Sequence, residues 1–291
     1  MKRRLFICSA CLSTLVNASS GLRLYQAPMD DSTWVVSEST PLNCQLDHVI
    51  PAFGVAHFTS TASSHINLDF SLDMRRLPAV THKVLLRSVP PPWRPGRSAK
   101  NVAQLNFYQQ FDGNVRDQPA WQMLSELDNG NFPTFYFNDW YSAGGATAVG
   151  LSSINFHNNY NQFIQCVGQL LPYSFNDIAF TVLNYQQNSD QLTKESKQKL
   201  ARVSNYVKYD KDINMIVIDG YTDSYGGRYT NQKLSEKRAE SVKKFFVSQG
   251  VQADKVQVTG FGEKNFIASN ETLLGRERNR RVVISLGKDN G

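Results

Sequence analysis

The sequence predicts an α+β protein: a mostly-β N-terminal domain, followed by a domain in which helices pack on a mixed sheet. In the first half of the chain, apolar and polar residues alternate over short segments, which is typical of strands with one buried face. In the second half, strand-like and helix-like segments follow one another in the order β-α-β-α-β-β. The chain has 291 residues, of which 41% are hydrophobic and 19% charged, as expected for about two folded domains.

The first 20 residues are typical of a secretory signal peptide. A basic start at residues 2–4 precedes an apolar run from Leu5 to Val16, and cleavage is expected after Ala18 or Ser20. The run is shorter than the roughly 20 residues that a membrane-spanning helix needs. We therefore expect an exported, periplasmic protein. A buried N-terminal strand and a lipoprotein anchored through Cys8 or Cys11 remain alternatives, although the apolar run continues past both cysteines.

Two cysteines remain after signal removal, Cys44 and Cys166. Two cysteines in an exported chain favour one disulfide, and two buried thiols are the alternative. The charge is also uneven. Residues 172–291 carry 19 Lys and Arg against 14 Asp and Glu, within a total net charge of +6. This basic C-terminal half suits an acidic polymer, and export argues against nucleic acid as that polymer.

Within the N-terminal domain, expected over residues 21–171, strand-like alternation runs from Ile66 to Asp73. A stiff loop, Pro90–Gly96, separates this segment from further strands around Leu105 and Phe107 and around Phe135 and Phe137. Helices are predicted over residues 119–128, with Gly130 just past the end, and over residues 160–170. A barrel and a sandwich both remain open.

In the C-terminal domain, expected over residues 172–291, the residue pattern predicts strands at residues 178–183, 215–218, 256–261 and 282–286. The unbroken apolar run Met215–Ile218 is typical of a strand covered on both faces. Helices are predicted at residues 193–208 and 231–249, the second stopped by Gly250.

Arg238 is unusual because its spacing from Leu234 and Val242 places it on the apolar stripe of its helix. A buried guanidinium is costly without a partner. Asp223 follows the central strand, at the sheet edge where α/β proteins tend to bind ligands. Asp223 and Arg238 together would suit a zwitterionic amino-acid group. A purely structural Asp–Arg salt bridge is the alternative.

The C-terminal region resembles the OmpA-like peptidoglycan-binding family. The matching segments are Ile218–Asp223, Asn231, Leu234–Ala239, Gly260–Glu263, Ala268–Asn270, Gly275–Arg276 and Asn279–Val282. The resemblance implies that Asp223 and Arg238 grip the diaminopimelate residue of the peptide stem. It implies further pocket residues at Thr222, Asn231, Leu234 and Arg281. The segment 183–190 departs from the family pattern as a longer exit from the first strand, so it leaves the contacts of that loop open.

Most of the chain after the signal also resembles the MotY family, which serves sodium-driven polar flagellar motors. The matching segments are Pro90–Gly96, Gln109–Gly113, Leu124–Leu127, Leu171–Phe175 and Ser189–Lys194. This resemblance implies that the N-terminal domain joins the basal body in the T ring, with MotX and the PomA–PomB stator as partners, while the C-terminal domain holds the ring to the wall. It also implies a Cys44–Cys166 disulfide. A Pal-like envelope anchor outside the motor is the alternative.

Catalytic motifs do not support an enzyme. The five histidines all precede the C-terminal domain and form no H-E-x-x-H zinc motif; they are His48, His57, His65, His82 and His157. Segments 196–199 and 241–244 match S-x-x-K but lack the companion motifs of serine acyltransferases. A wall hydrolase is thus the weaker hypothesis, and we expect no metal or cofactor. The N-terminal segment is also too polar and irregular for an OmpA-type membrane barrel.

Overall fold

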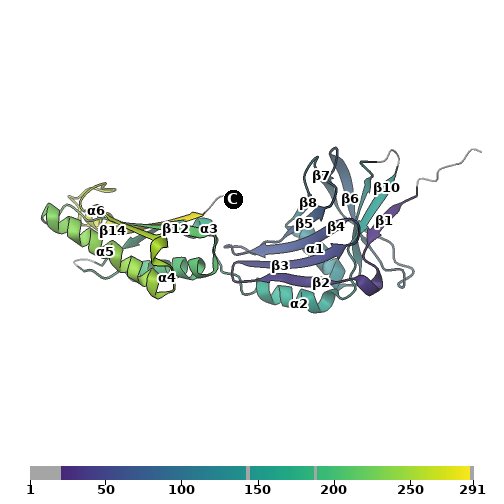
Figure 1. Ribbon diagram of the computed structural model, residues 1–291, viewed down its shortest axis with the longest axis horizontal. Helices are drawn as coiled ribbons and strands as arrows, with labels where there is room; N and C mark the ends of the chain where they lie inside the picture. The colour runs from purple at the N-terminus through teal and green to yellow at the C-terminus, as the bar shows by residue number, and fades with distance from the viewer. Residues whose placement is uncertain (1–20, 142–144, 187–188, 289–291) are drawn as a thin grey trace, which may run out of the picture.

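A computed structural model describes residues 21–141, 145–186 and 189–288 (Figure 1). The predicted signal peptide, with Cys8, Cys11 and both cleavage positions, lies outside the described residues. Within them, no helix is both long and apolar enough to cross a membrane.

The N-terminal region is built from two five-stranded sheets that enclose one hydrophobic core. The first sheet has the order β1 (Arg23–Gln26), β10 (Ala146–Gly150), β9 (Phe132–Asn138), β6 (His82–Val89) and β7 (Lys100–Phe107). The second has the order β2 (Trp34–Ser39), β3 (Asn43–Ile50), β4 (Gly54–Thr61), β5 (Asp69–Met74) and β8 (Gly113–Arg116). Because the two sheets are separate and pack face to face, the N-terminal domain is a sandwich and not a barrel, the two architectures that the sequence left open.

Two helices, α1 (Gln118–Asp128) and α2 (Phe156–Val167), pack on this sandwich, and a short 3-10 helix, Met29–Asp31, precedes β2. The prediction of α1 is confirmed, including Gly130 at a positive φ of 78° after its end. Helix α2 starts four residues earlier than predicted. Ile66 is 79% exposed rather than part of the alternating buried face, because β5 begins only at Asp69. Cys44 of β3 and Cys166 of α2 form the predicted disulfide.

The C-terminal region is a four-stranded sheet in the order β11 (Phe180–Asn184), β14 (Arg281–Lys288), β12 (Ile213–Gly220) and β13 (Val256–Gly260). Its helices are α3 (Phe175–Ile178), α4 (Lys194–Tyr209), α5 (Arg228–Ser248) and α6 (Leu273–Asn279), with a 3-10 turn at Ala253–Lys255. The parallel pair β12 and β13 is connected through α5, and β14 runs antiparallel to both β11 and β12. The predicted mixed sheet with packed helices is therefore confirmed.

Two predictions for this region are wrong in detail. The strand predicted from residue 178 starts at Phe180, because a capping box between Ser174 and Asp177 turns residues 175–178 into helix α3. The run Met215–Ile218 is not covered on both faces. Ile216 and Ile218 are fully buried toward the helices, whereas Met215 on the opposite face is 41% exposed.

The two regions meet at the ends of β3 and β4, where Figure 1 shows those strands reaching toward the C-terminal sheet. Leu42 and Ala62, which flank the β3–β4 pair, pack into the C-terminal hydrophobic core. The amide of Leu171 donates a hydrogen bond to the carbonyl of Pro41 at 2.8 Å. The connecting segment therefore returns to the sandwich before the second core begins.

We predict that acid destabilises the sandwich through His48. Its buried ring stacks on Trp34 at a centroid distance of 4.3 Å, and Nδ1 lies 2.7 Å from the Thr33 carbonyl oxygen. Burial lowers the pKa of His48 below its usual 6.5, against the opposing effect of the Thr33 carbonyl. A lowered folded-state pKa means that the unfolded chain binds the proton more readily. This stabilisation is complete above pH 6.5 and is lost as the pH falls through the folded-state value.

Urea unfolding at pH 7.5 and pH 5 measures this effect. The loss of unfolding free energy at pH 5 should be smaller in His48→Gln than in the unchanged protein. His65→Gln, at an exposed position, serves as the control and should keep the full loss. Equal losses in all three proteins would show that His48 does not carry the pH dependence.

Candidate functional site

The candidate site lies at the carboxyl end of β12, beside the first turns of α5. Helix α5 approaches the sheet closely because glycines occupy the crossing points. A Cβ on Gly220 would lie 2.2 Å from the Ser235 carbonyl oxygen, and one on Gly260 would lie 2.6 Å from the Glu236 amide. The small side chains of Ser235 and Ala239 are fully buried in this contact. The close approach places the buried face of α5 directly over the strand ends.

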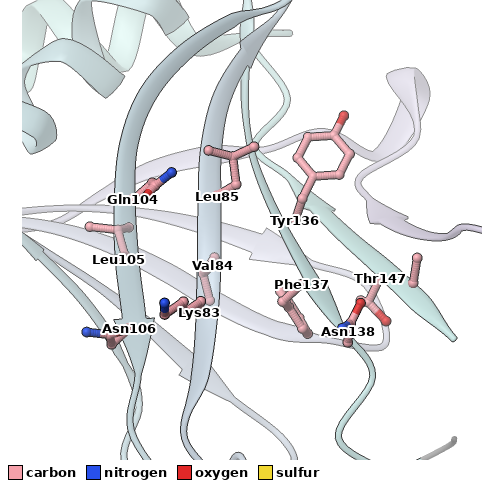
Figure 2. Close-up of a pocket in the computed structure, with 11 residues that line it drawn as sticks. Lys83, Val84, Leu85, Gln104, Leu105, Asn106, Tyr136, Phe137, Asn138 and Thr147 are labelled. Carbon is pink, nitrogen blue, oxygen red and sulfur yellow. The ribbon is translucent and has the colours of Figure 1, made fainter. Parts of the chain in front are cut away.

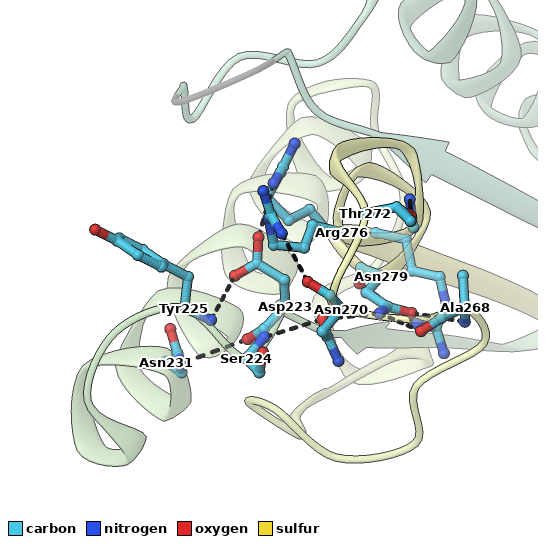
Figure 3. Close-up of polar contacts among 12 residues, drawn as sticks. Asp223, Ser224, Tyr225, Asn231, Ala268, Asn270, Thr272, Arg276 and Asn279 are labelled. Atoms are coloured by element: carbon cyan, nitrogen blue, oxygen red, sulfur yellow. Dashed lines mark hydrogen bonds and ion pairs between the residues drawn. The ribbon is translucent and has the colours of Figure 1, made fainter.

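Asp223 lies in the turn that follows β12 and is only 7% exposed. One carboxylate oxygen accepts a hydrogen bond from the Tyr225 amide at 3.0 Å (Figure 3). The other lies 2.7 Å from Nη1 of Arg280. The ion-pair partner of Asp223 is therefore Arg280, between α6 and β14, and not Arg238. An ionised carboxylate has about four acceptor positions, so these two bonds leave acceptor capacity.

Arg238 projects from α5 and is 5% exposed, as its place on the apolar stripe predicted. Its guanidinium carbon lies 4.4 Å from the ring centroid of Tyr185, and Nη2 donates to the Ser189 carbonyl oxygen at 3.2 Å. Asp190 approaches the same Nη2 only to 3.7 Å. Among the described residues, Nε and Nη1 of Arg238 have no hydrogen-bond partner although both are buried.

Burial lowers the pKa of Arg238, and the neighbouring Tyr185 and Asp190 oppose that shift. Burial also raises the pKa of Tyr185 to about 12, so this phenol stays neutral at neutral pH and supplies a ring face rather than a counter-ion. The carboxylate of Asp223 contributes to the electrostatic environment of Arg238 without bonding to it. The arrangement is an under-paired buried cation, which favours an added anionic group.

The other predicted site residues divide into two groups. Thr222 and Asn231 are buried beside Asp223: the Asn231 amide nitrogen donates to the Asp223 carbonyl oxygen at 3.4 Å and to Glu263 at 3.1 Å. The Thr222 hydroxyl has no hydrogen-bond partner among the described residues. Leu234 is half-buried on α5.

Arg281 instead belongs to a neighbouring structural contact. Its guanidinium carbon lies 4.0 Å from the Tyr221 ring centroid, and its nitrogens donate to the carbonyl oxygens of Asn265 and Asn279. Burial lowers the pKa of Arg281, partly offset by Tyr221. These contacts satisfy both terminal nitrogens within the protein, which distinguishes Arg281 from Arg238.

The sequence patterns gave no role to Arg280, nor to Asn270 and Asn279, which precede it. Asn279 is fully buried and bonds the amides of Ile267 and Ala268 through Oδ1, while Nδ2 donates to Asn270 at 3.0 Å. Asn270 in turn accepts the Ser224 amide at 3.2 Å, so a continuous network reaches the Asp223 turn (Figure 3). The run of arginines around Asn279 carried a signal, but their spacing alone does not say which arginine faces the carboxylate.

Family comparisons agree with the two-part architecture. Residues 25–172 match the MotY N-terminal domain, and residues 184–280 match the OmpA family. The fold and the site thus define a protein with an OmpA-type domain behind a flagellar N-terminal domain. The sodium-type flagellar protein MotY of Vibrio parahaemolyticus is 48% identical over 286 residues, which cover 97% of each chain. The chain belongs to the MotY family.

Two further matches each cover about a third of this chain. The outer-membrane lipoprotein YfiB of Pseudomonas aeruginosa is 39% identical over 100 residues, which cover 34% of this chain and 59% of YfiB. A crystal structure of the periplasmic domain of Helicobacter pylori MotB covers 38% of this chain and 74% of that chain, at 25% identity and a TM-score of 0.33.

We predict that Gly220→Ala destabilises the C-terminal domain by about 1–3 kcal/mol, since the added methyl group meets the backbone of α5 and forces the helix outward. Denaturant unfolding measures the loss. Gly227→Ala is the matched control, because its Cβ would meet only the Thr230 hydroxyl at 3.8 Å. If both variants unfold at the same denaturant concentration as the unchanged protein, the close helix–sheet approach does not limit stability.

Proposed function

We propose that this protein is a non-catalytic anchor of a sodium-driven polar flagellar motor, bound to peptidoglycan through its C-terminal domain. In this proposal residues 1–20 are the signal peptide, residues 21–171 join the basal body as part of the T ring, and residues 172–291 bind the wall. The observation that carries the wall-binding part is the buried Arg238 guanidinium, whose Nε and Nη1 have no hydrogen-bond partner among the residues that the structure describes. Membership of the MotY family supports the motor part.

The chemistry of the site suits diaminopimelate. This residue of the peptide stem carries an ammonium and a carboxylate on one carbon, and the two would engage Asp223 and Arg238 respectively. Arg238 offers two donors to the carboxylate that no described residue occupies, and Asp223 keeps acceptor positions for the ammonium. Thr222, Asn231 and Leu234 shape the adjoining wall of the pocket in this proposal, and Arg281 supports it from behind through Tyr221.

The assembly partners in this proposal are those that the family resemblance implies. We assign contacts with MotX, the basal body and the PomA–PomB stator to the N-terminal sandwich, which leaves the C-terminal site accessible to the wall. A Pal-like anchor outside the motor fits the C-terminal domain equally well, but it does not account for the match of residues 25–172 to the MotY N-terminal domain.

We predict that Arg238→Lys and Asp223→Asn each weaken co-sedimentation of the mature protein with purified peptidoglycan by about tenfold or more, the loss expected for a hydrogen bond to a charged group. Lysine keeps the charge of Arg238 but loses the planar donor fork. Free diaminopimelate should compete with the unchanged protein. Arg202→Gln on α4, which stacks on Tyr173, is the control and should bind normally.

Thermal melts accompany the binding assay, because removing one member of a buried charged group also costs stability. The proposed pocket is wrong if the folded Arg238→Lys and Asp223→Asn proteins still sediment with the wall as the unchanged protein does.

We further predict that Asp190 competes with the ligand. Its carboxylate lies 3.7 Å from Nη2 of Arg238 and 3.1 Å from Lys237, so its negative charge offsets part of the attraction that the guanidinium would exert on a ligand carboxylate. An exposed ion pair of this kind contributes up to about 1 kcal/mol, which ligand binding must overcome. Asp190→Asn removes that cost and should therefore tighten wall binding by up to about fivefold. Asp254→Asn, at a distant exposed turn, tests for a simple charge effect. Equal gains in both variants would assign the change to net charge alone.

A further inference from the structure

The first sheet of the sandwich splits between two of its paired strands. The ladder between β6 and β9 runs from Val89↔Phe132 to Leu85↔Tyr136 and stops there. On either side, β6 stays paired with β7 as far as His82↔Phe107, and β9 stays paired with β10 as far as Ala146↔Asn138. The two hairpins therefore diverge, and a cavity of about 690 Å³ opens between them (Figure 2).

Both sides of this opening are strand edges. Lys83 and Val84 of β6 face Phe137 and Asn138 of β9, with no ladder pairing across the gap. Successive residues of a strand direct their N–H and C=O groups to opposite sides, so each edge turns at least one residue's backbone groups into the gap. Unpaired strand edges bind extended peptides by adding a strand.

The side chains that line the opening suit a strand with apolar residues on both faces. Leu85 and Tyr136 lie at the outer face of the sheet, while the largely buried Val84 and Phe137 lie at its inner face. Figure 2 shows the lining side chains coming from both separated hairpins, with the gap between them. Helices would not present backbone groups to these edges, so the geometry favours an extended occupant.

Basic side chains extend the opening at its inner end. A second cavity of about 300 Å³ shares Phe137 and Thr147 with the first and is lined by Arg23, Arg75 and Arg76. Arg23 lies 3.4 Å from Asp139, and Arg76 stacks 4.2 Å from the Tyr141 ring centroid. With Lys83 at the first cavity, four cations and the carboxylate of Asp139 line the combined groove, so it favours acidic side chains.

We propose that the opening between β6 and β9 receives an extended segment of a protein partner, which adds a strand to the sheet and places acidic side chains against Arg75 and Arg76. This inference rests on the proposed function for its setting, in that the sandwich is the motor-attachment domain. It adds the surface, the binding mode and the chemistry of the partner segment, which carries apolar residues flanked by Asp or Glu.

Hydrogen exchange of the full mature chain tests the binding mode. The probe is hook–basal bodies purified from polar-flagellated cells that lack this protein. On binding, at least one amide of residues 83–84 and at least one of residues 137–138, those that face the gap, should gain at least tenfold protection because they become part of a ladder. Co-sedimentation without this protection overturns the strand-addition proposal and leaves the motor assignment intact.

Failure to co-sediment at all overturns the motor assignment as well. Protection that rises with protein concentration without basal bodies identifies a second copy as the occupant and also overturns the proposal.

Charge reversal tests the chemistry of the partner. The double variant Arg75→Glu with Arg76→Glu should weaken basal-body binding by about tenfold or more, with a steeper salt dependence in the unchanged protein. The matched control reverses Arg97 and Lys100, two exposed cations near the opposite end of β7. Equal effects of the two double variants, with unchanged melting temperatures, would show that the basic groove does not select the partner.

Discussion

The close packing of α5 on the strand ends is the constraint on which the C-terminal site depends. Gly220 and Gly260 leave no side chain between helix and sheet, and Ser235 fills the contact from the other side. The Ser235 hydroxyl also accepts the Gly262 amide at 2.9 Å, which ties the helix to the turn after β13. Because the helix is fixed this closely, Asn231 and Arg238 are buried at the same sheet edge as Asp223, which lies in the turn after β12.

The two charged groups at this edge of the sheet differ in how completely they are paired. Asp223 is neutralised by Arg280 at 2.7 Å, whereas Arg238 is held by a carbonyl, a ring face and a distant carboxylate. A fully paired Arg238 would gain little from a ligand carboxylate, since the exchange would replace one strong bond by another. An under-paired guanidinium in a buried setting gives a ligand anion a larger share of the interaction energy.

Periodicity and local composition predicted most of the helices and strands. The spacing of Arg238 from Leu234 and Val242 also predicted that its side chain is buried, because residue spacing determines which face of a helix is buried. Apart from the disulfide, the sequence patterns did not predict which residues far apart along the chain come into contact. Asp223 and Arg280 are 57 residues apart and meet only because β14 returns beside β12, so spacing could not select Arg280 over its neighbours. The open outer face of β12 was missed for a similar reason: an apolar run does not reveal on which side the helices lie. The gap between β6 and β9 depends on where a ladder stops, which alternation alone does not encode.

The junction between the two regions connects the proposed attachment surfaces mechanically. Leu42 and Ala62 sit in the C-terminal core, and Leu171 bonds Pro41 next to them. Cys44 lies two residues beyond Leu42, and its disulfide to Cys166 joins β3 to the helix that leads into the connecting segment. A force that pulls the C-terminal domain away from the sandwich therefore meets a covalent closure of the 122-residue loop before it reaches the strand ladders. Hydrophobic contacts position the junction, while the disulfide limits how far the two chain segments can separate under load.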